Sequence, residues 1–288
     1  MAYTSYAELS QDGLEAGSLV AAVIAREAEE SGEAVVVLRT RMLDTLLTMR
    51  EAVARGLAAD TRSRSGLVGG DAKRVSTSEG GPIGGTFAAT LAAALATAEV
   101  NATMGRVVAA PTGGASGILP AVVLTIAERA AADDELLIDA LFVAAGIGGI
   151  IASRATLSGA AGGCQAEIGS GAAMAAAAAV TLSGGSPQQV GHAASLALQG
   201  LMGLICDPVG GLVEVPCVHR NATGAAVALA AAELAMADVC CRIPFDEVVD
   251  AQAHVGRSLP PSLRETSTGG LAATPTGRAL AASSLPRR

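Results

Sequence analysis

Long stretches rich in alanine and glycine are the feature that most constrains the fold of this chain. No formally charged residue lies between Glu167 and Asp207, and that stretch is broken by a polar turn at residues 183–189. Alanine has the highest intrinsic helix propensity, so such stretches favour helices that approach one another closely. Hydrophobic residues make up 51% of the 288 residues but aromatic residues only 2%, so the core must come from small aliphatic side chains. We predict an all-α fold of packed Ala/Gly-rich helices.

The pattern of apolar and turn residues places the helices along the chain. Helices are predicted over residues 7–30, 34–57, 86–97, 117–132, 135–153, 166–182, 186–204, 222–241 and 245–257. Asp133 is suited to cap one of them, and Ser186 with Pro187 and Gln189 forms a helix start signal. Residues 35–38 and 107–110 are the short strand candidates, so few or no strands are expected. We predict one helical domain over 1–288, with N-terminal helices over 1–60 and a Gly/Pro/Thr-rich tail over 259–288.

Charge and cysteine usage narrow the class of protein. A formal charge of −8 argues against a nucleic-acid-binding protein, which needs a basic face. The start of the chain lacks a signal-peptide pattern, and five cysteines do not indicate a disulfide framework, so a reducing cytoplasm is expected. A mean hydropathy of +0.47 raises the possibility of a membrane protein. The apolar pieces are rich in Ala and Gly rather than Leu, Ile and Phe, so we expect buried helices and no membrane span.

Three cysteines lie in segments punctuated by glycine and proline. Cys164 follows two glycines and precedes a helical run, while the segment from Cys206 to Cys217 contains two glycines and two prolines before its final cysteine. Turns with free backbone amides suit an iron–sulfur cluster, and three thiolates would leave one iron of a four-iron cluster open as a Lewis acid. Three buried structural thiols explain the spacing equally well. Cys240 and Cys241 are neighbours within a predicted helix and are assigned to packing.

Several segments resemble the α-subunit of the iron–sulfur-dependent L-serine dehydratases (L-serine ammonia-lyases). They are residues 69–73, 98–112, 158–159, 162–167, 206–217, 220–222, 264–266 and 269–272, and the resemblance runs from about residue 60 to about residue 278. It implies that Cys164, Cys206 and Cys217 hold a [4Fe–4S] cluster in a helical catalytic domain without pyridoxal phosphate. The implied reaction converts L-serine to pyruvate and ammonia, in amino-acid degradation that feeds gluconeogenesis.

The same resemblance implies roles for polar residues in the matching segments. Lys73 and Glu167 are candidates for the catalytic base, and the implied substrate contacts are Asn101, Thr112, Gly113, Ser158 and Gln165. Turn architecture accounts for Asn101, Thr112 and Gly113 equally well, and Gln165 and Glu167 could only orient the loop of Cys164. His219 is expected at the rim of the site, and Asn221 as a helix cap.

A partner and two rival functions complete the predictions. The chain lacks a segment like the family's β-domain, so a separate β-subunit and an oligomer are expected. Alanine at position 161, where the family often has glutamate, leaves the substrate contacts less defined. One rival is an L-cysteine desulfidase-like iron–sulfur lyase. The other is a non-enzymatic helical protein whose cysteines are only structural.

Overall fold

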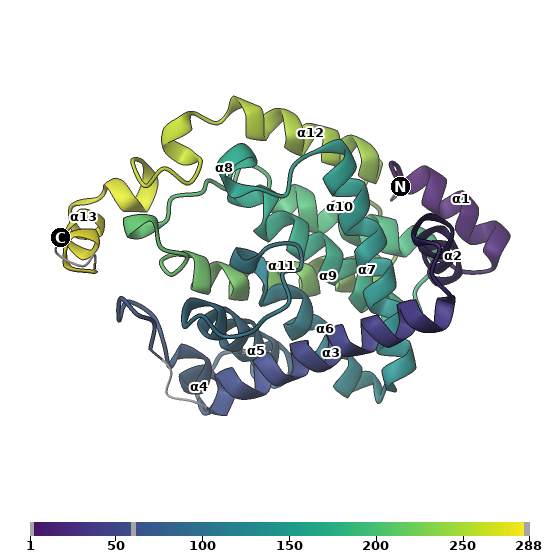
Figure 1. Cartoon of the computed structure of the whole chain (residues 1–288), viewed down its shortest axis with the longest axis horizontal. Coiled ribbons are helices and arrows are strands. Elements are labelled where there is room, and N and C mark those ends of the chain that lie inside the picture. The colour runs from purple at the N-terminus through teal and green to yellow at the C-terminus, as the bar shows by residue number, and fades with distance from the viewer. Residues whose placement is uncertain (1–2, 59–61, 285–288) are drawn as a thin grey trace.

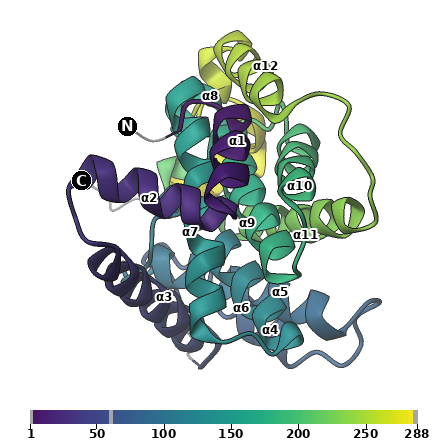
Figure 2. The same cartoon turned by 90° about the vertical axis from the view of Figure 1, so that its right-hand side faces the viewer.

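The computed structural model describes residues 3–58 and 62–284, and these residues are predominantly helical with no β-sheet. Helix α9 (Ile168–Leu182) lies at the centre and is buried along almost its whole length (Figures 1 and 2). The helices packed against it are α6 (Ile118–Ala130), α7 (Asp134–Arg154), α10 (Pro187–Gly200) and α11 (Cys217–Met236). The all-α prediction is confirmed.

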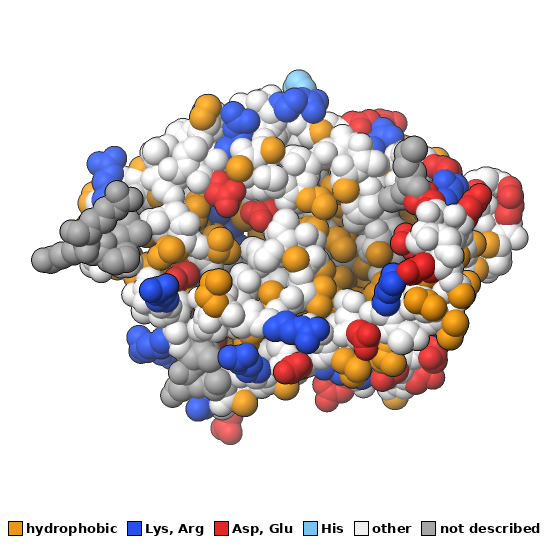
Figure 3. Space-filling model, viewed as in Figure 1, with side chains coloured by type: hydrophobic (Ala, Val, Ile, Leu, Met, Phe, Trp, Pro, Cys, Tyr) orange, Lys and Arg blue, Asp and Glu red, His pale blue; other side chains and the backbone are white. Residues whose placement is uncertain are grey.

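The remaining helices surround this central group. They are α1 (Tyr6–Ala16), α2 (Leu19–Ser31), α3 (Val35–Ala58), α4 (Asp71–Ser76), α5 (Gly85–Ala102), α8 (Gly159–Gly162), α12 (Phe245–Ser258) and α13 (Pro275–Ser284), with short 3₁₀ helices at Gly113–Ala115, Cys164–Ala166, Val209–Gly211, Pro261–Leu263 and Gly270–Ala273. Helices α1 and α2 lie at the opposite end of the molecule from α13 (Figure 1). Acidic side chains gather over the end formed by α1 and α2 (Figure 3).

Small residues allow the helices to approach closely, as the composition predicts. In α9 the side chains of residues 175–178 are fully buried alanines. Where α3 crosses α5, a Cβ atom at Gly56 would lie 2.3 Å from the carbonyl oxygen of Ala96. No side chain larger than hydrogen fits at that crossing, because real Cβ atoms do not approach backbone atoms so closely.

The predicted helix starts at two positions are confirmed. Asp133 caps α7, where its side chain accepts a hydrogen bond from the Leu136 amide. Ser186 caps α10 in a complete capping box with Gln189. The single helix predicted over 7–30 is wrong, because Gly17 adopts φ +85° and Ser18 caps a second helix, so the segment forms α1 and α2.

Other local predictions are also wrong. Residues 35–38, a strand candidate, form the first turn of α3, where Leu38 is buried and Val36 is 70% exposed. Residues 107–110 form no strand. Helix α11 begins at Cys217 rather than at residue 222 and ends at Met236. Cys240 and Cys241 therefore lie beyond the helix, and Cys240 is exposed rather than packed.

The segment expected to be a tail contains ordered short helices in residues 261–284, including α13, which packs against the 3₁₀ helix at Val209–Gly211. The structure thus joins the end of the chain to the loop that carries Cys206.

Helix α7 is long and apolar enough to cross a bilayer by length and composition alone. Two-thirds of the most apolar stretch of this helix is buried inside the protein. Core helices of proteins that span no membrane have the same property.

Candidate functional site

The structure brings the three predicted cluster cysteines together from separate segments. Cys164 begins the 3₁₀ helix before α9, Cys206 lies in the loop after α10, and Cys217 is the first residue of α11. All three are free thiols and no more than 7% exposed. Cys164 and Cys206 are hydrogen-bonded through their side chains, and the charge of Cys164 acts on Cys217.

The C-terminal segment holds Cys206 in place. The Cys206 amide donates to the carbonyl of Leu263 (2.9 Å), and the Glu265 amide donates to the carbonyl of Cys206 (2.7 Å). These bonds form an isolated parallel bridge between Cys206 and Arg264. Both backbone polar groups of Cys206 are therefore satisfied, which fixes the direction of its side chain.

Burial and mutual contact give the three thiols different acidities. The hydrogen bond with Cys206 lowers the pKa of the Cys164 thiol against the effect of burial, and the positive charge of Arg220 lowers it further. The same hydrogen bond, together with burial, raises the pKa of Cys206. Burial raises the pKa of Cys217 to about 12. In the metal-free protein Cys164 is thus the preferred thiolate, and Arg220 is the cation beside it.

Glu167 lies next to Cys206 in this arrangement. A Cβ atom at Gly159 would lie 2.5 Å from Glu167 Oε2 and 3.1 Å from Cys206 Sγ, so the carboxylate and the sulfur border the same small space. The Thr112 hydroxyl donates to Glu167 Oε1 (2.7 Å). Burial raises the pKa of Glu167, the Thr112 hydrogen bond lowers it, and the charge of Glu265 raises it. Because position 159 is glycine, both groups can pack against its backbone.

Asn101 and Gly113 lie on the other side of Thr112. Asn101 belongs to the last turn of α5, and its Oδ1 would be 3.4 Å from a Cβ atom at Gly113. Gly113 begins a 3₁₀ helix directly after Thr112. The structure therefore brings Asn101, Thr112, Gly113 and Glu167 to the cysteine site, although they come from three different segments.

The other predicted site residues are placed differently. Lys73 is exposed on α4, and Ser158 is exposed directly before α8. Gln165 is 1% exposed, and its side-chain amide bonds only to backbone: Nε2 donates to the carbonyls of Gly162 and Gln252, and Oε1 accepts from the Gly203 amide. These bonds match the alternative in which Gln165 orients the loop of Cys164.

His219 and Asn221, which were not predicted to bind substrate or the cluster, make specific contacts. His219 is exposed as expected, and its Nε2 lies 3.1 Å from Asp71. Asn221 does not cap a helix, because it sits inside the first turns of α11. It accepts from the Gly117 amide (2.9 Å) and donates to the carbonyls of Gly114 (2.8 Å) and Cys217 (2.9 Å). Asn221 thereby joins the Cys217 helix to the loop that carries Gly113.

Sequence reasoning missed the side chains that hold the loops. Glu214 is buried between the two later cysteines and accepts hydrogen bonds from the hydroxyls of Ser63 and Ser65. Arg220 lies 2.8 Å from the buried carboxylate of Asp207. Asp207, Glu214 and Arg220 lie in segments that resemble the family, but nothing in the sequence shows which residues they contact.

The three thiols match the donor chemistry of an iron–sulfur cluster. Within residues 3–58 and 62–284, no set of three or more His, Cys, Asp or Glu side chains has the geometry of a single-ion site. The three free thiols nevertheless converge in a buried place, and thiolates are the usual ligands of iron–sulfur clusters. Glycine at position 159 lets the sulfur of Cys206 and the carboxylate of Glu167 pack against its backbone, because a Cβ atom there would crowd both.

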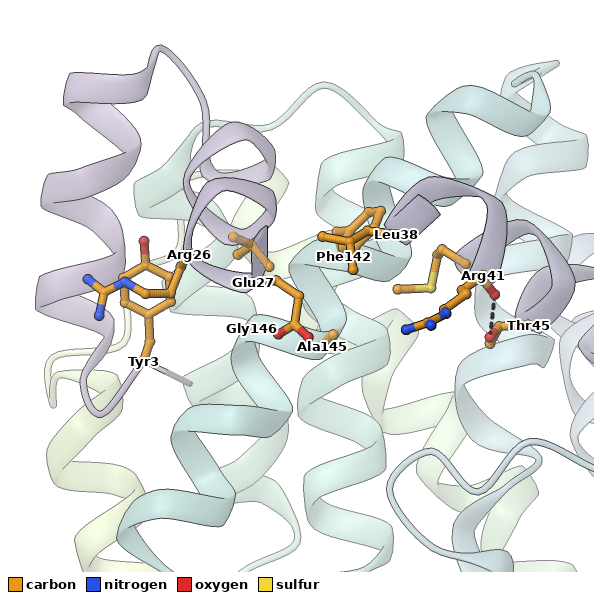
Figure 4. Close-up of a pocket in the computed structure, with 11 residues that line it drawn as sticks. Tyr3, Arg26, Glu27, Leu38, Arg41, Thr45, Phe142, Ala145 and Gly146 are labelled. Atoms are coloured by element: carbon orange, nitrogen blue, oxygen red, sulfur yellow. Dashed lines mark hydrogen bonds between the residues drawn. The ribbon is translucent and has the colours of Figure 1, made fainter. Parts of the chain in front are cut away.

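A separate cavity lies between α2, α3 and α7 (Figure 4). Its volume is ≈ 310 Å³, and its lining includes the rings of Tyr3 and Phe142. Arg26 stacks on the Tyr3 ring, 4.4 Å from its centroid, and pairs with Glu8 and Asp12. This cavity shares no residue with the cysteine site.

Comparison with known proteins shows the family of this chain. The family model described as serine dehydratase alpha chain matches residues 15–272. A probable L-serine dehydratase alpha chain of Bacillus subtilis is 44% identical over 264 residues, covering 90% of this chain and 87% of the relative. A probable L-serine dehydratase alpha chain of Latilactobacillus sakei is 51% identical, covering 63% of this chain and 87% of the relative. The L-serine dehydratase alpha chain of Peptoniphilus asaccharolyticus is 49% identical, covering 62% of each chain. The chain therefore belongs to the serine dehydratase alpha chain family.

Proposed function

We propose that this chain is the α-subunit of an L-serine dehydratase that converts L-serine to pyruvate and ammonia, with a [4Fe–4S] cluster held by Cys164, Cys206 and Cys217. The observation that carries the proposal is the convergence of three buried thiols, from separate structural elements, beside the Glu167 carboxylate. When bound, the cluster would supply an iron without a protein ligand, a Lewis acid for the departing hydroxyl group. L-serine is proposed as the substrate because the relatives are named L-serine dehydratases.

The chain's own residues account for the remaining steps of the elimination. Glu167 is the better placed of the two candidate bases, because its carboxylate lies beside Cys206 at Gly159 while Lys73 is exposed on α4. Glu167 would take the α-proton of serine, and hydroxide would leave from the β-carbon. The enamine released by this step becomes pyruvate and ammonia by tautomerisation and hydrolysis.

Residues beside Glu167 would orient this base and bind the substrate. The Thr112 hydroxyl holds Glu167 Oε1 through its hydrogen bond, so the second oxygen is left to face Gly159. The Asn101 amide lies at the turn that begins with Gly113, where backbone amides can bind a carboxylate. In this proposal Asn101 and the Gly113 turn hold the substrate carboxylate.

A separate β-subunit and a cytoplasmic location belong to the same proposal. The relatives are named alpha chains, which implies a second kind of subunit. Reducing conditions would keep the three thiols free to bind iron.

The test is anaerobic purification with and without a co-expressed β-subunit, followed by iron and sulfide analysis and pyruvate assays. Serine at Cys164, Cys206 or Cys217 should remove the brown chromophore and the activity. The double replacement of Cys240 and Cys241 by serine is the matched control and should leave both intact. A colourless wild-type protein would refute the cluster and favour a structural role for the thiols. Faster pyruvate formation from L-cysteine than from L-serine would favour the desulfidase.

A further inference from the structure

Arg220 is a partly buried arginine for which the proposed reaction gives no role. It lies on α11, one turn after Cys217, and its side chain is 14% exposed. Its Nη1 donates to the carbonyl of Ile205 (2.9 Å), and its Nη2 lies 2.8 Å from Asp207 Oδ1. The Asp207 contact is an ion pair rather than a well-aligned hydrogen bond. Arg220 therefore grips the residues on both sides of Cys206 from the helix that begins with Cys217.

Asp207 connects Arg220 to a third segment, the C-terminal segment that contains Leu271. Its Oδ2 accepts a hydrogen bond from the Leu271 amide (2.7 Å), and its side chain is 1% exposed. Gly270 has φ +56°, and a Cβ atom there would lie 2.3 Å from the same oxygen. The carboxylate thus fills the space that glycine leaves. Arg220 and Asp207 together connect α11, the Cys206 loop and the C-terminal segment.

Arg220 also acts on the remaining cysteine segment, because its positive charge interacts with the Cys164 thiolate. Guanidinium stays protonated in proteins and has five donors in a rigid fork, so one side chain can serve a carbonyl, a carboxylate and a sulfur together. Three buried thiolates would place strong negative charge in a region of low dielectric constant. The positive charge of Arg220 opposes that charge from a side chain that is only 14% exposed.

We propose that Arg220 is a positioning residue that fixes Cys206 relative to Cys217 and balances the charge of the thiolates, so that it governs how firmly a cluster is held and at what potential it is reduced. The positioning role stands on the contacts of Arg220 alone, and the reduction potential rests on the proposed function.

Two variants separate the two roles. Arg220→Lys keeps the charge but loses the fork, and Arg220→Met loses both. Arg154→Met is the matched control, because Arg154 also joins a carboxylate (Asp250) and a backbone carbonyl (Thr4), and neither partner belongs to the segment of Cys206 and Cys217. Asp207→Asn keeps the acceptor for Leu271 and removes the ion pair, which covers the case in which Arg220→Met does not fold.

The first measurement is hydrogen exchange in metal-free protein. The amides of Cys206, bonded to Leu263, and Val209, bonded to the carbonyl of Val215, report on the loop. Both should exchange faster in the Arg220 variants and in Asp207→Asn, and at the wild-type rate in Arg154→Met. Unchanged exchange at both amides in Arg220→Met and Asp207→Asn would overturn the positioning role.

The second measurement uses anaerobically reconstituted protein. Iron loss to a chelator should be roughly 10–100-fold faster in Arg220→Met, the range found when groups that orient metal ligands are removed. The reduction potential should become more negative in Arg220→Met and stay near the wild-type value in Arg220→Lys, which a merely structural role would not produce. Equal iron retention and potential in wild type and Arg220→Met would overturn the charge role. If wild-type protein takes up no cluster, the proposed function and the charge role both fail, and the exchange measurement decides the positioning role.

Discussion

Replacing Gly56 by alanine tests whether missing side-chain volume sets the distance between helices. A Cβ atom at Gly56 would lie 2.3 Å from the oxygen, 2.5 Å from the carbon and 2.6 Å from the Cα of Ala96. All three are backbone atoms of α5, so no side-chain rotation can relieve the overlap. Helices α3 and α5 would have to move apart, and their buried contacts would loosen.

The size of the effect follows from two opposing contributions. Extra volume in a packed core costs about 1–3 kcal/mol, and the upper value applies because the blocking atoms are backbone. Alanine in place of glycine in a helix recovers about 1 kcal/mol. The net loss in the free energy of unfolding is therefore about 2 kcal/mol. With an unfolding entropy of about 2.1 cal/mol/K per residue, a chain of 288 residues should lose roughly 3 °C in Tm.

The assay is urea and thermal unfolding of the metal-free protein, followed by circular dichroism, so that the result does not depend on a cluster. Gly200→Ala is the control, because Gly200 is an exposed helical residue whose Cβ atom would meet only Val227 Cγ1, at 3.6 Å. That variant should match the wild type or be up to about 1 kcal/mol more stable. If Gly56→Ala proves as stable as Gly200→Ala, the close-contact argument is refuted.

Three further variants test buried polar groups. Burial raises the pKa of Glu99, so the folded state holds its proton more tightly and loses stability as pH rises above 4.5. In urea unfolding from pH 4 to 7, the stability of Glu99→Gln should therefore rise relative to that of the wild type, by at most about 1.4 kcal/mol per pH unit. Parallel stability curves for the two proteins would contradict this. Asn221→Ala leaves the Gly117 amide unpaired and should cost about 1–3 kcal/mol in urea unfolding, a loss that Asn221→Asp should partly restore because it keeps the acceptor. Glu214→Ala leaves the buried Ser63 hydroxyl without its carboxylate, so limited proteolysis should cut residues 62–70 faster, while an unchanged rate would show that the carboxylate does not hold this loop.

Local signals in the sequence predicted the helices whose ends depend on neighbouring residues. Asp133 and Ser186 cap helices through side chains that reach only three residues along the chain, so their effect is readable without the fold. Three β-branched valines also made residues 35–38 a strand candidate, which is wrong, because the chain there forms α3, as the overlapping helix prediction over 34–57 expects. Packing of the buried Leu38 and the residues that follow overrides that local preference.

The site shows the same division between short-range and long-range information. The motifs pointed to Cys164, Cys206 and Cys217, and the fold brings them together. The side chains of Gln165 and Asn221 hydrogen-bond to backbone groups tens of residues away. No pattern in the neighbouring sequence could therefore show that these two side chains hold loops rather than bind substrate. The partners of Arg220 were equally hidden.

The helical fold and the close packing of the helices can be predicted from the sequence, because alanine propensity, glycine volume and helix caps act within a few residues. The polar contacts become visible only in the folded chain: Glu167 lies beside Cys206, and Arg220 binds the residues on both sides of that cysteine. These contacts join residues that lie far apart along the chain, and only the packing of whole helices brings them within hydrogen-bonding distance.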